Sequence, residues 1–342
     1  MAFLSSLPGL AAIFVVSAIA VWFAGGRLSA STDALAHRYH LGEALGGVIL
    51  LAVATNLPEI AITSTAAVSG HLDLAVGNLL GGIGIQTVVL VALDVARPSP
   101  LTSRTTSLRP LLTAGLVVAV LSVTVMGTAV PRSLIFARLT PEDIAVTAVW
   151  LAGLVLVKRA GGGLPWVLAK PPPKARSKPA QTNKSFLDRH PLSVFCAAAV
   201  VTLAAGAALA QTGEAISTSI GLNGVVFGAT FLAAVTSLPE LSTGLAAVRM
   251  DDHELAVSDI FGGNAFLPVL FLLATLLSGK PALPEAGKSD VYLAVFAILL
   301  TMPYMAGLLF RPRREIARLG LDSIAVLVIY VVGVGGLLFV GR

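Results

Sequence analysis

The chain contains the stretch Ala54-Thr55-Asn56-Leu57-Pro58-Glu59 and, later, the related stretch Val235-Thr236-Ser237-Leu238-Pro239-Glu240. The two glutamates are 181 positions apart. The same offset, without a gap, aligns further positions: Leu41 with Leu222, Gly47 with Gly228, and Gly81-Gly82 with Gly262-Gly263. A duplication of this length indicates two structural repeats. Each copy places a carboxylate beside a proline within a long apolar segment, and an ionisable side chain at membrane depth indicates a functional site.

The composition predicts an all-α integral membrane protein. Of 342 residues, 56% are hydrophobic and 12% are charged, and the mean hydropathy is +0.89. Soluble domains carry about 25% charged residues. We expect no cleavable signal peptide, because no basic region precedes the first apolar run. One cysteine, Cys196, excludes an internal disulfide and a cysteine metal cluster.

Ten apolar segments are long enough to cross a bilayer, which takes about 20 residues. They span residues 8–36, 42–69, 72–95, 108–129, 141–158, 191–220, 223–249, 253–278, 290–310 and 320–340. A basic segment, residues 159–190, contains Pro171-Pro172-Pro173 and separates the copies. The predicted organisation is a first repeat over residues 1–158, a loop over 159–190 and a second repeat over 191–342.

Five spans per repeat is an odd number, so the second copy is predicted to be inverted in the membrane. With ten spans, the loops on one face of the membrane contain 17 basic residues and those on the other face contain five. Cytoplasmic loops carry the excess of lysine and arginine. We therefore expect loop 159–190 in the cytoplasm and both termini outside, in the inner membrane of a prokaryotic cell. The formal charge of +5 reflects this orientation rather than a nucleic-acid partner. Inverted repeats are typical of transporters, whose substrates bind near the midplane at helix breaks.

The two proline–glutamate segments supply the oxygen ligands of a cation. Pro58 and Pro239 each disrupt the helical bond of a carbonyl four residues earlier. Calcium prefers six to eight hard oxygen ligands at about 2.3–2.6 Å. Carboxylates come from Glu59 and Glu240, and hydroxyls from the positions Thr55, Thr236 and Ser237. The alternative is that the prolines are ordinary kinks and each glutamate pairs with a basic residue. However, no lysine or arginine lies between positions 38 and 97 or between 189 and 249.

Two pairs of segments resemble the alpha-repeats of the Ca²⁺:cation antiporter superfamily. The first pair is Thr-Ser-Leu-Pro-Glu at 236–240 and the related stretch 55–59. The second pair, nineteen residues further on, is Ser258–Asn264 and Gly77–Ile83. The sequence is most similar to the sodium/calcium exchanger branch. The resemblance implies two inverted five-helix repeats, with calcium bound by Glu59, Glu240 and the backbone oxygens of Thr55 and Thr236. It implies a secondary antiporter rather than an enzyme. Transported Ca²⁺ and Na⁺ would be its ligands, without a permanently bound cofactor.

The chain departs from the family pattern where resembling exchangers bind sodium. The small hydroxyl residues are replaced by Asn56, Gly82 and Gly263, and one turn further on stand Gln86 and Leu267. Helical spacing places Asn78, Gly82 and Gln86 on one face, and Asp259, Gly263 and Leu267 on its counterpart. Asn78 and Asp259 are therefore candidate site residues, and Asp259 could restore a charge to the cavity.

Three alternatives remain open from the sequence. The first is a proton-coupled exchanger of Ca²⁺ or another divalent cation. The second is an intramembrane hydrolase that uses the paired carboxylates, although no nucleophile–base pair is visible. The third is a membrane scaffold without transport. Of the other acidic residues, Asp94 is expected at the membrane interface, and the turn 251–254 is expected to be solvated. The sequence leaves the oligomeric state open.

Overall fold

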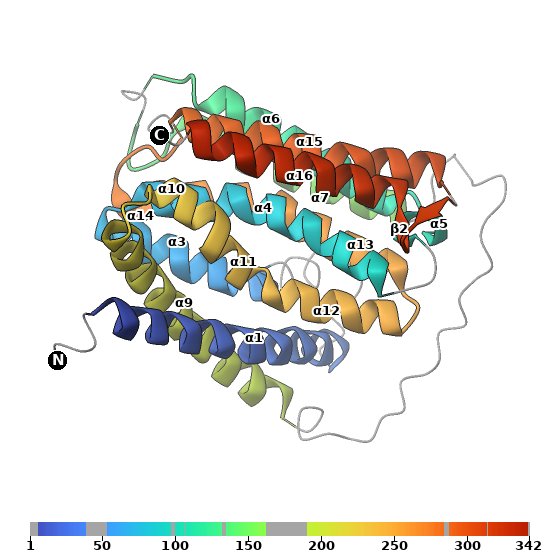
Figure 1. Cartoon of the computed structure of the whole chain (residues 1–342), viewed down its shortest axis with the longest axis horizontal. Coiled ribbons are helices and arrows are strands. Elements are labelled where there is room, and N and C mark those ends of the chain that lie inside the picture. The colour runs from blue at the N-terminus through green and yellow to red at the C-terminus, as the bar shows by residue number, and fades with distance from the viewer. Residues whose placement is uncertain are drawn as a thin grey trace.

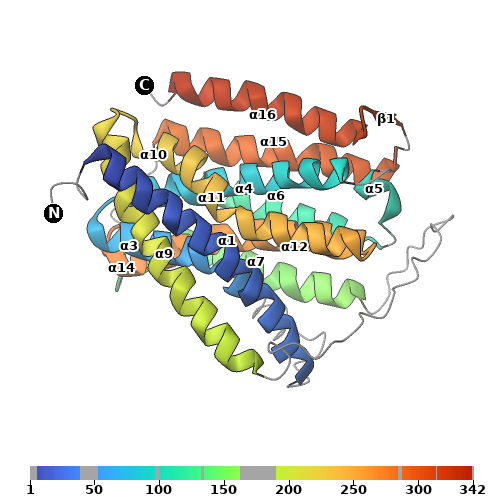
Figure 2. The same cartoon turned by 60° about the horizontal axis from the view of Figure 1, so that its bottom comes forward.

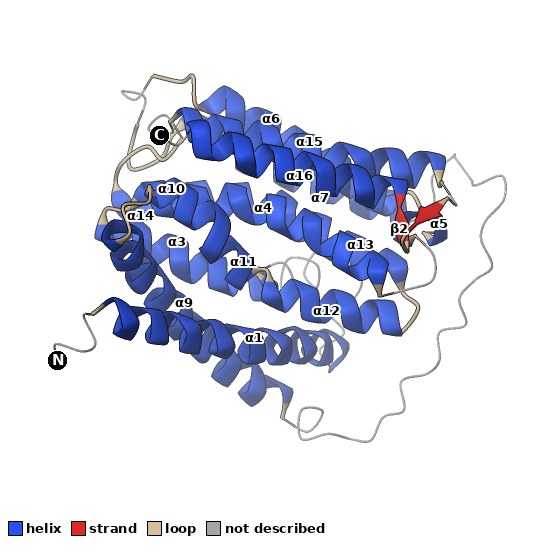
Figure 3. Cartoon of the chain, viewed as in Figure 1, coloured by secondary structure: helices blue, strands red, loops and turns tan. Residues whose placement is uncertain are grey.

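The computed structural model describes residues 6–38, 53–96, 100–105, 107–131, 135–161, 190–283, 287–312 and 314–340. Within these ranges the chain is nearly all helical (Figure 3). The first repeat contains α1 (Leu7–Arg38), α3 (Leu57–Ser69), α4 (Leu72–Val95), α5 (Leu101–Arg104), α6 (Arg109–Gly127) and α7 (Pro141–Gly161). The predicted residues 42–52 lie outside the described part.

The second repeat follows the same order with more interruptions. Its helices are α9 (Pro191–Ser219), α10 (Gly224–Phe227), the π-helix η1 (Gly228–Leu232), α11 (Ala233–Thr236), α12 (Leu238–Arg249), α13 (His253–Phe266), the 3₁₀-helix η2 (Leu267–Val269), α14 (Leu270–Ser278), α15 (Lys288–Phe310) and α16 (Leu321–Val340). A two-stranded hairpin, β1 (Glu315–Ile316) and β2 (Leu319–Gly320), joins the last two helices.

Eight of the ten predicted spans are long and apolar enough to cross a membrane in the described part of the chain. The other two correspond to α7, which carries charged residues in its first and last turns, and to α3, of which 13 residues are described. The chain is therefore an integral membrane protein. The helix α1 begins and α16 ends at the same side of the molecule, at the left in Figure 1.

The packing of the helices follows the internal repeat. The helix α9 packs on α3, and its repeat counterpart α1 packs on α12. Likewise α4 packs on α15 as α13 packs on α6. The pair α1 and α9 crosses outside the central helices α3, α4, α12 and α13, as Figure 2 shows. This arrangement puts both proline–glutamate segments in the middle of the molecule.

A buried polar network fixes the end of α4. Asp94, which was expected at the membrane interface, stands in the last turn of α4 and is buried within the protein, with 1% of its surface exposed. Its carboxylate accepts hydrogen bonds from the Leu101 and Gly320 backbone N–H groups, at 2.7 and 2.9 Å, and from the Ser323 hydroxyl at 2.7 Å. These bonds join α4 to α5 and to the start of α16.

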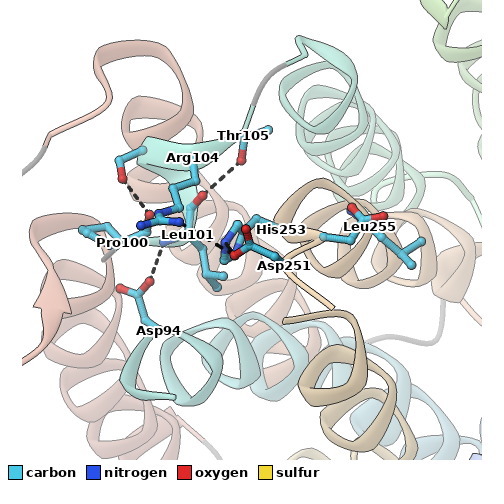
Figure 4. A network of polar contacts seen from close by, with 10 residues as sticks. Asp94, Pro100, Leu101, Arg104, Thr105, Asp251, His253 and Leu255 are labelled. Atoms are coloured by element: carbon cyan, nitrogen blue, oxygen red, sulfur yellow. Dashed lines mark hydrogen bonds and ion pairs between the residues drawn. The ribbon is translucent and has the colours of Figure 1, made fainter. Parts of the chain in front are cut away.

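The acidic turn between α12 and α13 is attached to the same region rather than only solvated. The Arg104 guanidinium lies 3.7 Å from the Asp251 carboxylate, and the buried His253 Nε2 lies 3.1 Å from it (Figure 4). Next to them, the Ser107 hydroxyl donates to Glu254. The turn therefore packs against the connection between α4 and α6.

Candidate functional site

Both prolines interrupt their helices at the predicted places. Residue Asn56 is a turn residue before α3, and Ser237 separates α11 from α12. The helices then restart: the Ile60 N–H donates to the Asn56 carbonyl at 3.0 Å, and the Leu241 N–H to the Ser237 carbonyl at 3.2 Å. The glutamates therefore occupy the first turn of α3 and of α12. The positive end of a helix dipole favours a carboxylate at this position.

Glu59 and Glu240 lie close together and are buried, with 0% and 3% of their surface exposed. The Glu59 Oε1 atom accepts a hydrogen bond from Gln86 Nε2 at 3.4 Å. Within the described residues, the Glu59 Oε2 atom and both Glu240 carboxylate oxygens make no hydrogen bond. Among the described residues, no salt bridge involves either glutamate. Buried carboxylates without partners are energetically costly, and a bound cation would satisfy them.

A third carboxylate adds to this negative field. Asp259, on α13, lies near enough to Glu240 for charge repulsion, and it accepts a hydrogen bond from the Thr243 hydroxyl of α12 at 3.0 Å. It lines a cavity of about 560 Å³ together with Thr55, Ser258 and Gly263. The cavity also has Arg109, Asp252 and Glu254 in its wall. A water-filled cavity with excess negative charge attracts cations.

The polar neighbours of the glutamates come from both repeats. The Thr236 side chain, from the second repeat, lies beside Glu59 of the first. The Asn56 amide donates to the Thr55 hydroxyl at 3.3 Å. The hydroxyls of Thr236 and Ser237 both donate to the Ala233 carbonyl, at 3.3 and 2.7 Å.

Asn78 is placed differently from the other candidates. It is fully buried where α4 meets η1, and a Cβ at Gly228 would lie 2.8 Å from the Asn78 backbone nitrogen. In the described residues, neither atom of its amide has a hydrogen-bond partner, and no bond joins it to Glu59 or Glu240. The structure thus brings together Glu59, Glu240, Thr236 and Asp259, and the role of Asn78 in the site stays a prediction.

Two residues that the sequence analysis did not propose as ligands lie at the centre of the molecule: Gln86, which it named only as a departure from the family pattern, and Asn264. Gln86 contacts Glu59 directly. Asn264 is fully buried, and its amide donates to the Ile83 carbonyl at 3.5 Å and to the Thr87 hydroxyl at 3.2 Å. Since Asn264 is the repeat counterpart of Ile83, the pseudo-two-fold axis passes between them. The available signal was the position of Gln86 on the same helix face as Gly82.

Comparisons with known proteins agree with this fold. The chain is 27% identical over 319 residues to the putative antiporter CaxA of Alkalimonas amylolytica, covering 89% of this chain and 93% of the relative. Its structure resembles that of the sodium-calcium exchanger NCX_Mj, with a TM-score of 0.59, 14% identity, and coverage of 96% and 99%. It also resembles the H⁺/Ca²⁺ exchanger CAX, with a TM-score of 0.62, 13% identity, and coverage of 97% and 88%.

The two structural likenesses show a shared exchanger fold of inverted repeats. The family model described as sodium/calcium exchanger protein matches residues 9–157 and 190–339, one match to each repeat. These matches cover most of the chain and include both proline–glutamate segments. The chain therefore belongs to the sodium/calcium exchanger family of membrane cation exchangers.

Proposed function

We propose that this protein is a secondary antiporter that moves Ca²⁺ across the membrane in exchange for Na⁺, at a site between the two proline–glutamate segments. The observation that carries the proposal is the pair of buried glutamates from opposite repeats, three of whose carboxylate oxygens have no hydrogen-bond partner in the part of the chain that the structure describes. Two negative charges balance one divalent ion. The Thr55 and Thr236 backbone oxygens would complete its coordination, and Asp259 would draw cations through the cavity.

Alternating access would expose this site to each side in turn. The helices α1 and α9 contact the two breaks through repeat-related glycines. A Cβ on Gly25 of α1 would lie 2.5 Å from the Pro239 side chain, and one on Gly206 of α9 would lie 3.1 Å from the Pro58 carbonyl. Glycine has no side chain, so α1 and α9 approach the two prolines closely at these contacts. Sliding of α1 and α9 past the central helices would uncover the site from opposite sides.

Calcium uptake into proteoliposomes tests this function. Purified protein is reconstituted, and uptake of radiolabelled calcium is measured after an outward gradient of Na⁺, K⁺ or H⁺ is imposed separately. At least one gradient should drive calcium above its equilibrium level. Calcium entry that equals that of empty vesicles under every gradient would contradict the proposal.

Proton coupling is the second candidate. It is favoured by Gly82 and Gly263, which supply no side-chain oxygen where the family places small hydroxyls, and by the apolar Leu267. A proton needs a single carboxylate oxygen, whereas sodium needs several oxygen ligands.

Asp259→Asn is expected to weaken calcium transport severely, by about tenfold. Asn78→Ala should weaken transport less. Asp259 carries a charge in the cavity, and a hydrogen bond or contact to a charged group contributes roughly 1.5–3 kcal/mol. Asn78 carries no charge, so its replacement leaves the charge of the site unchanged. Initial uptake rates at several calcium concentrations measure both effects. Unchanged affinity and rate in Asp259→Asn would show that Asp259 has a structural role.

The orientation is tested with single cysteines in a Cys196→Ala background. His190→Cys precedes α9, and Ser289→Cys lies in the first turn of α15. With the predicted topology, a membrane-impermeant maleimide added to intact cells labels Ser289→Cys, and it labels His190→Cys only after lysis. Labelling of both positions in intact cells would show that the assigned topology is wrong. We propose that the membrane is the inner membrane of a prokaryotic cell.

A further inference from the structure

Two acidic side chains lie close together where α4 and α15 begin. Asp290, in the first turn of α15, is 5% exposed, and its Oδ2 atom accepts a hydrogen bond from the Gly287 N–H at 2.6 Å. Its Oδ1 atom has no hydrogen-bond partner in the described part of the chain. Asp73, in the first turn of α4, is exposed and lies near enough to Asp290 for charge repulsion. Buried charges in proteins are paired or coordinate metals, so this arrangement calls for a cation.

The described residues supply no basic partner for the two aspartates. Lys288 precedes Asp290 by two residues, but it is exposed and forms no salt bridge with either aspartate within the described ranges. The imidazole of His71, two residues before Asp73, lies 3.3 Å from the Glu214 carboxylate of α9 instead. The entrance beside Asp73 and Asp290 therefore has an excess of negative charge.

The repeat-related positions at the opposite face carry an acid and a base. The offset of 181 relates Asp73 to Glu254 and Arg109 to Asp290. Both Glu254 and Arg109 line the cavity of about 560 Å³ described above. The Ser107 hydroxyl joins them, because it donates to Glu254 and accepts from the Arg109 N–H at 3.2 Å. One face thus has an acid and a base where the other face has two acids.

The aspartates stand beside the part of α4 that α10 and η1 cover. By the same offset, the residues of α13 in the cavity wall correspond to residues of α4. A Cβ on Gly77 of α4 would overlap the Val225 carbonyl of α10, and a Cβ on Gly224 would overlap the Asp73 carboxylate. The counterpart of the cavity is therefore filled, with Asp73 at its edge. When alternating access opens this face, Asp73 and Asp290 would line its entrance.

We infer that Asp73 and Asp290 form a cation-capture site at one face of the membrane, where they concentrate divalent cations at the entrance to the transport site. This inference rests on the proposed function, because the captured ion is the one that the antiporter carries. The negative field of two carboxylates raises the local concentration of cations, and their oxygens are the hard ligands that Ca²⁺ prefers. The topology predicted from the basic residues puts this face outside the cell.

Calcium self-exchange measured from each face tests the inference without assuming a counter-ion. Right-side-out and inverted membrane vesicles are loaded with unlabelled calcium, and uptake of radiolabelled calcium gives the half-saturation concentration at the face turned outward. Uptake by vesicles without the protein is subtracted. Asp290→Asn keeps an oxygen for the Gly287 N–H and removes one charge. It should raise the half-saturation concentration about three- to tenfold at the face of the aspartates and less than about twofold at the other face, as expected for one charge beside water.

A second variant and a control complete the test. Asp73 is exposed, so Asp73→Asn should leave the fold intact and raise the half-saturation concentration at the same face. Glu315→Gln removes an exposed carboxylate from the hairpin at the opposite face and should change neither value. Increasing choline chloride from about 0.01 M to about 0.1 M shortens the Debye length from about 30 Å to about 10 Å. This increase should raise the half-saturation concentration more in wild type than in Asp290→Asn, which a structural role of Asp290 does not predict.

The outcomes separate the capture site from the proposed function. If wild-type vesicles exchange no calcium, the proposed function fails and the capture site fails with it. If wild-type vesicles exchange calcium, only the capture site is overturned by unchanged values in Asp290→Asn and Asp73→Asn, by equal increases at both faces, or by equal salt dependence in wild type and Asp290→Asn.

Discussion

Replacing Glu59 or Glu240 by glutamine should abolish calcium transport while leaving the protein folded. Each substitution keeps the size of the side chain and removes one of the two charges that would balance the divalent ion. Removing one partner from a buried charge pair costs about 3–5 kcal/mol, which corresponds to a loss of roughly two to four orders of magnitude in affinity. Raising the calcium concentration a few-fold should therefore not restore uptake. Proteoliposome uptake and calcium binding by calorimetry measure the two consequences.

A third buried glutamate gives a matched control. Glu142 is 4% exposed, and in the described residues neither of its carboxylate oxygens has a hydrogen-bond partner, but it lies in the first turn of α7 and not in a helix break. Glu142→Gln should therefore transport calcium like wild type. Wild-type flux in both Glu59→Gln and Glu240→Gln would contradict the assignment of the site.

The fold could be predicted because the internal repeat and the length of the apolar segments are both visible in the sequence. Most helix limits agree with the predicted spans within a few residues, as with α9 and α16. The interruption at η2 was not predicted, although Pro268 marks it. The buried network of Asp94 was not predicted either, because its partners Gly320 and Ser323 lie more than 220 residues later.

The site could be predicted where chemistry and repetition coincide. Glu59 and Glu240 follow from a carboxylate beside a proline, repeated at one offset. Gln86 could not be identified in this way, since its importance depends on the contact with Glu59, 27 residues earlier. Asn78 shows the limit of helical periodicity: its position on one face of α4 made it a candidate, and in the described part of the chain its buried amide makes no hydrogen bond to either glutamate. A shared helix face is thus weaker evidence than a repeated functional group.

In the proposed antiporter, the counter-ion has to balance the charge that remains in the site when calcium is absent. Glu59, Glu240 and Asp259 then share one region, and an uncompensated buried charge is strongly unfavourable. Sodium could neutralise part of it near Gly263, where the Asn56 and Gln86 amides provide oxygens. Near Gly82 the neighbour is Leu267, so sodium has few ligands there. A proton can bind a carboxylate oxygen directly and needs no further oxygen ligands.

We therefore expect calcium flux to depend strongly on pH near neutrality and to respond less to a sodium gradient than it does in exchangers that carry the family's hydroxyls. Uptake is measured at fixed pH with the proton gradient collapsed by an ionophore, and then with each gradient imposed alone. Asn56→Ser/Gly82→Ser/Gly263→Ser restores the family's hydroxyls and should increase the response to sodium. Steep, saturable sodium-driven uptake by wild type that does not change between about pH 6 and 8, the range in which proton competition is expected, would rule out the proton contribution. The unmodified chain would then couple calcium to sodium alone, with the amides of Asn56 and Gln86 replacing the missing hydroxyls.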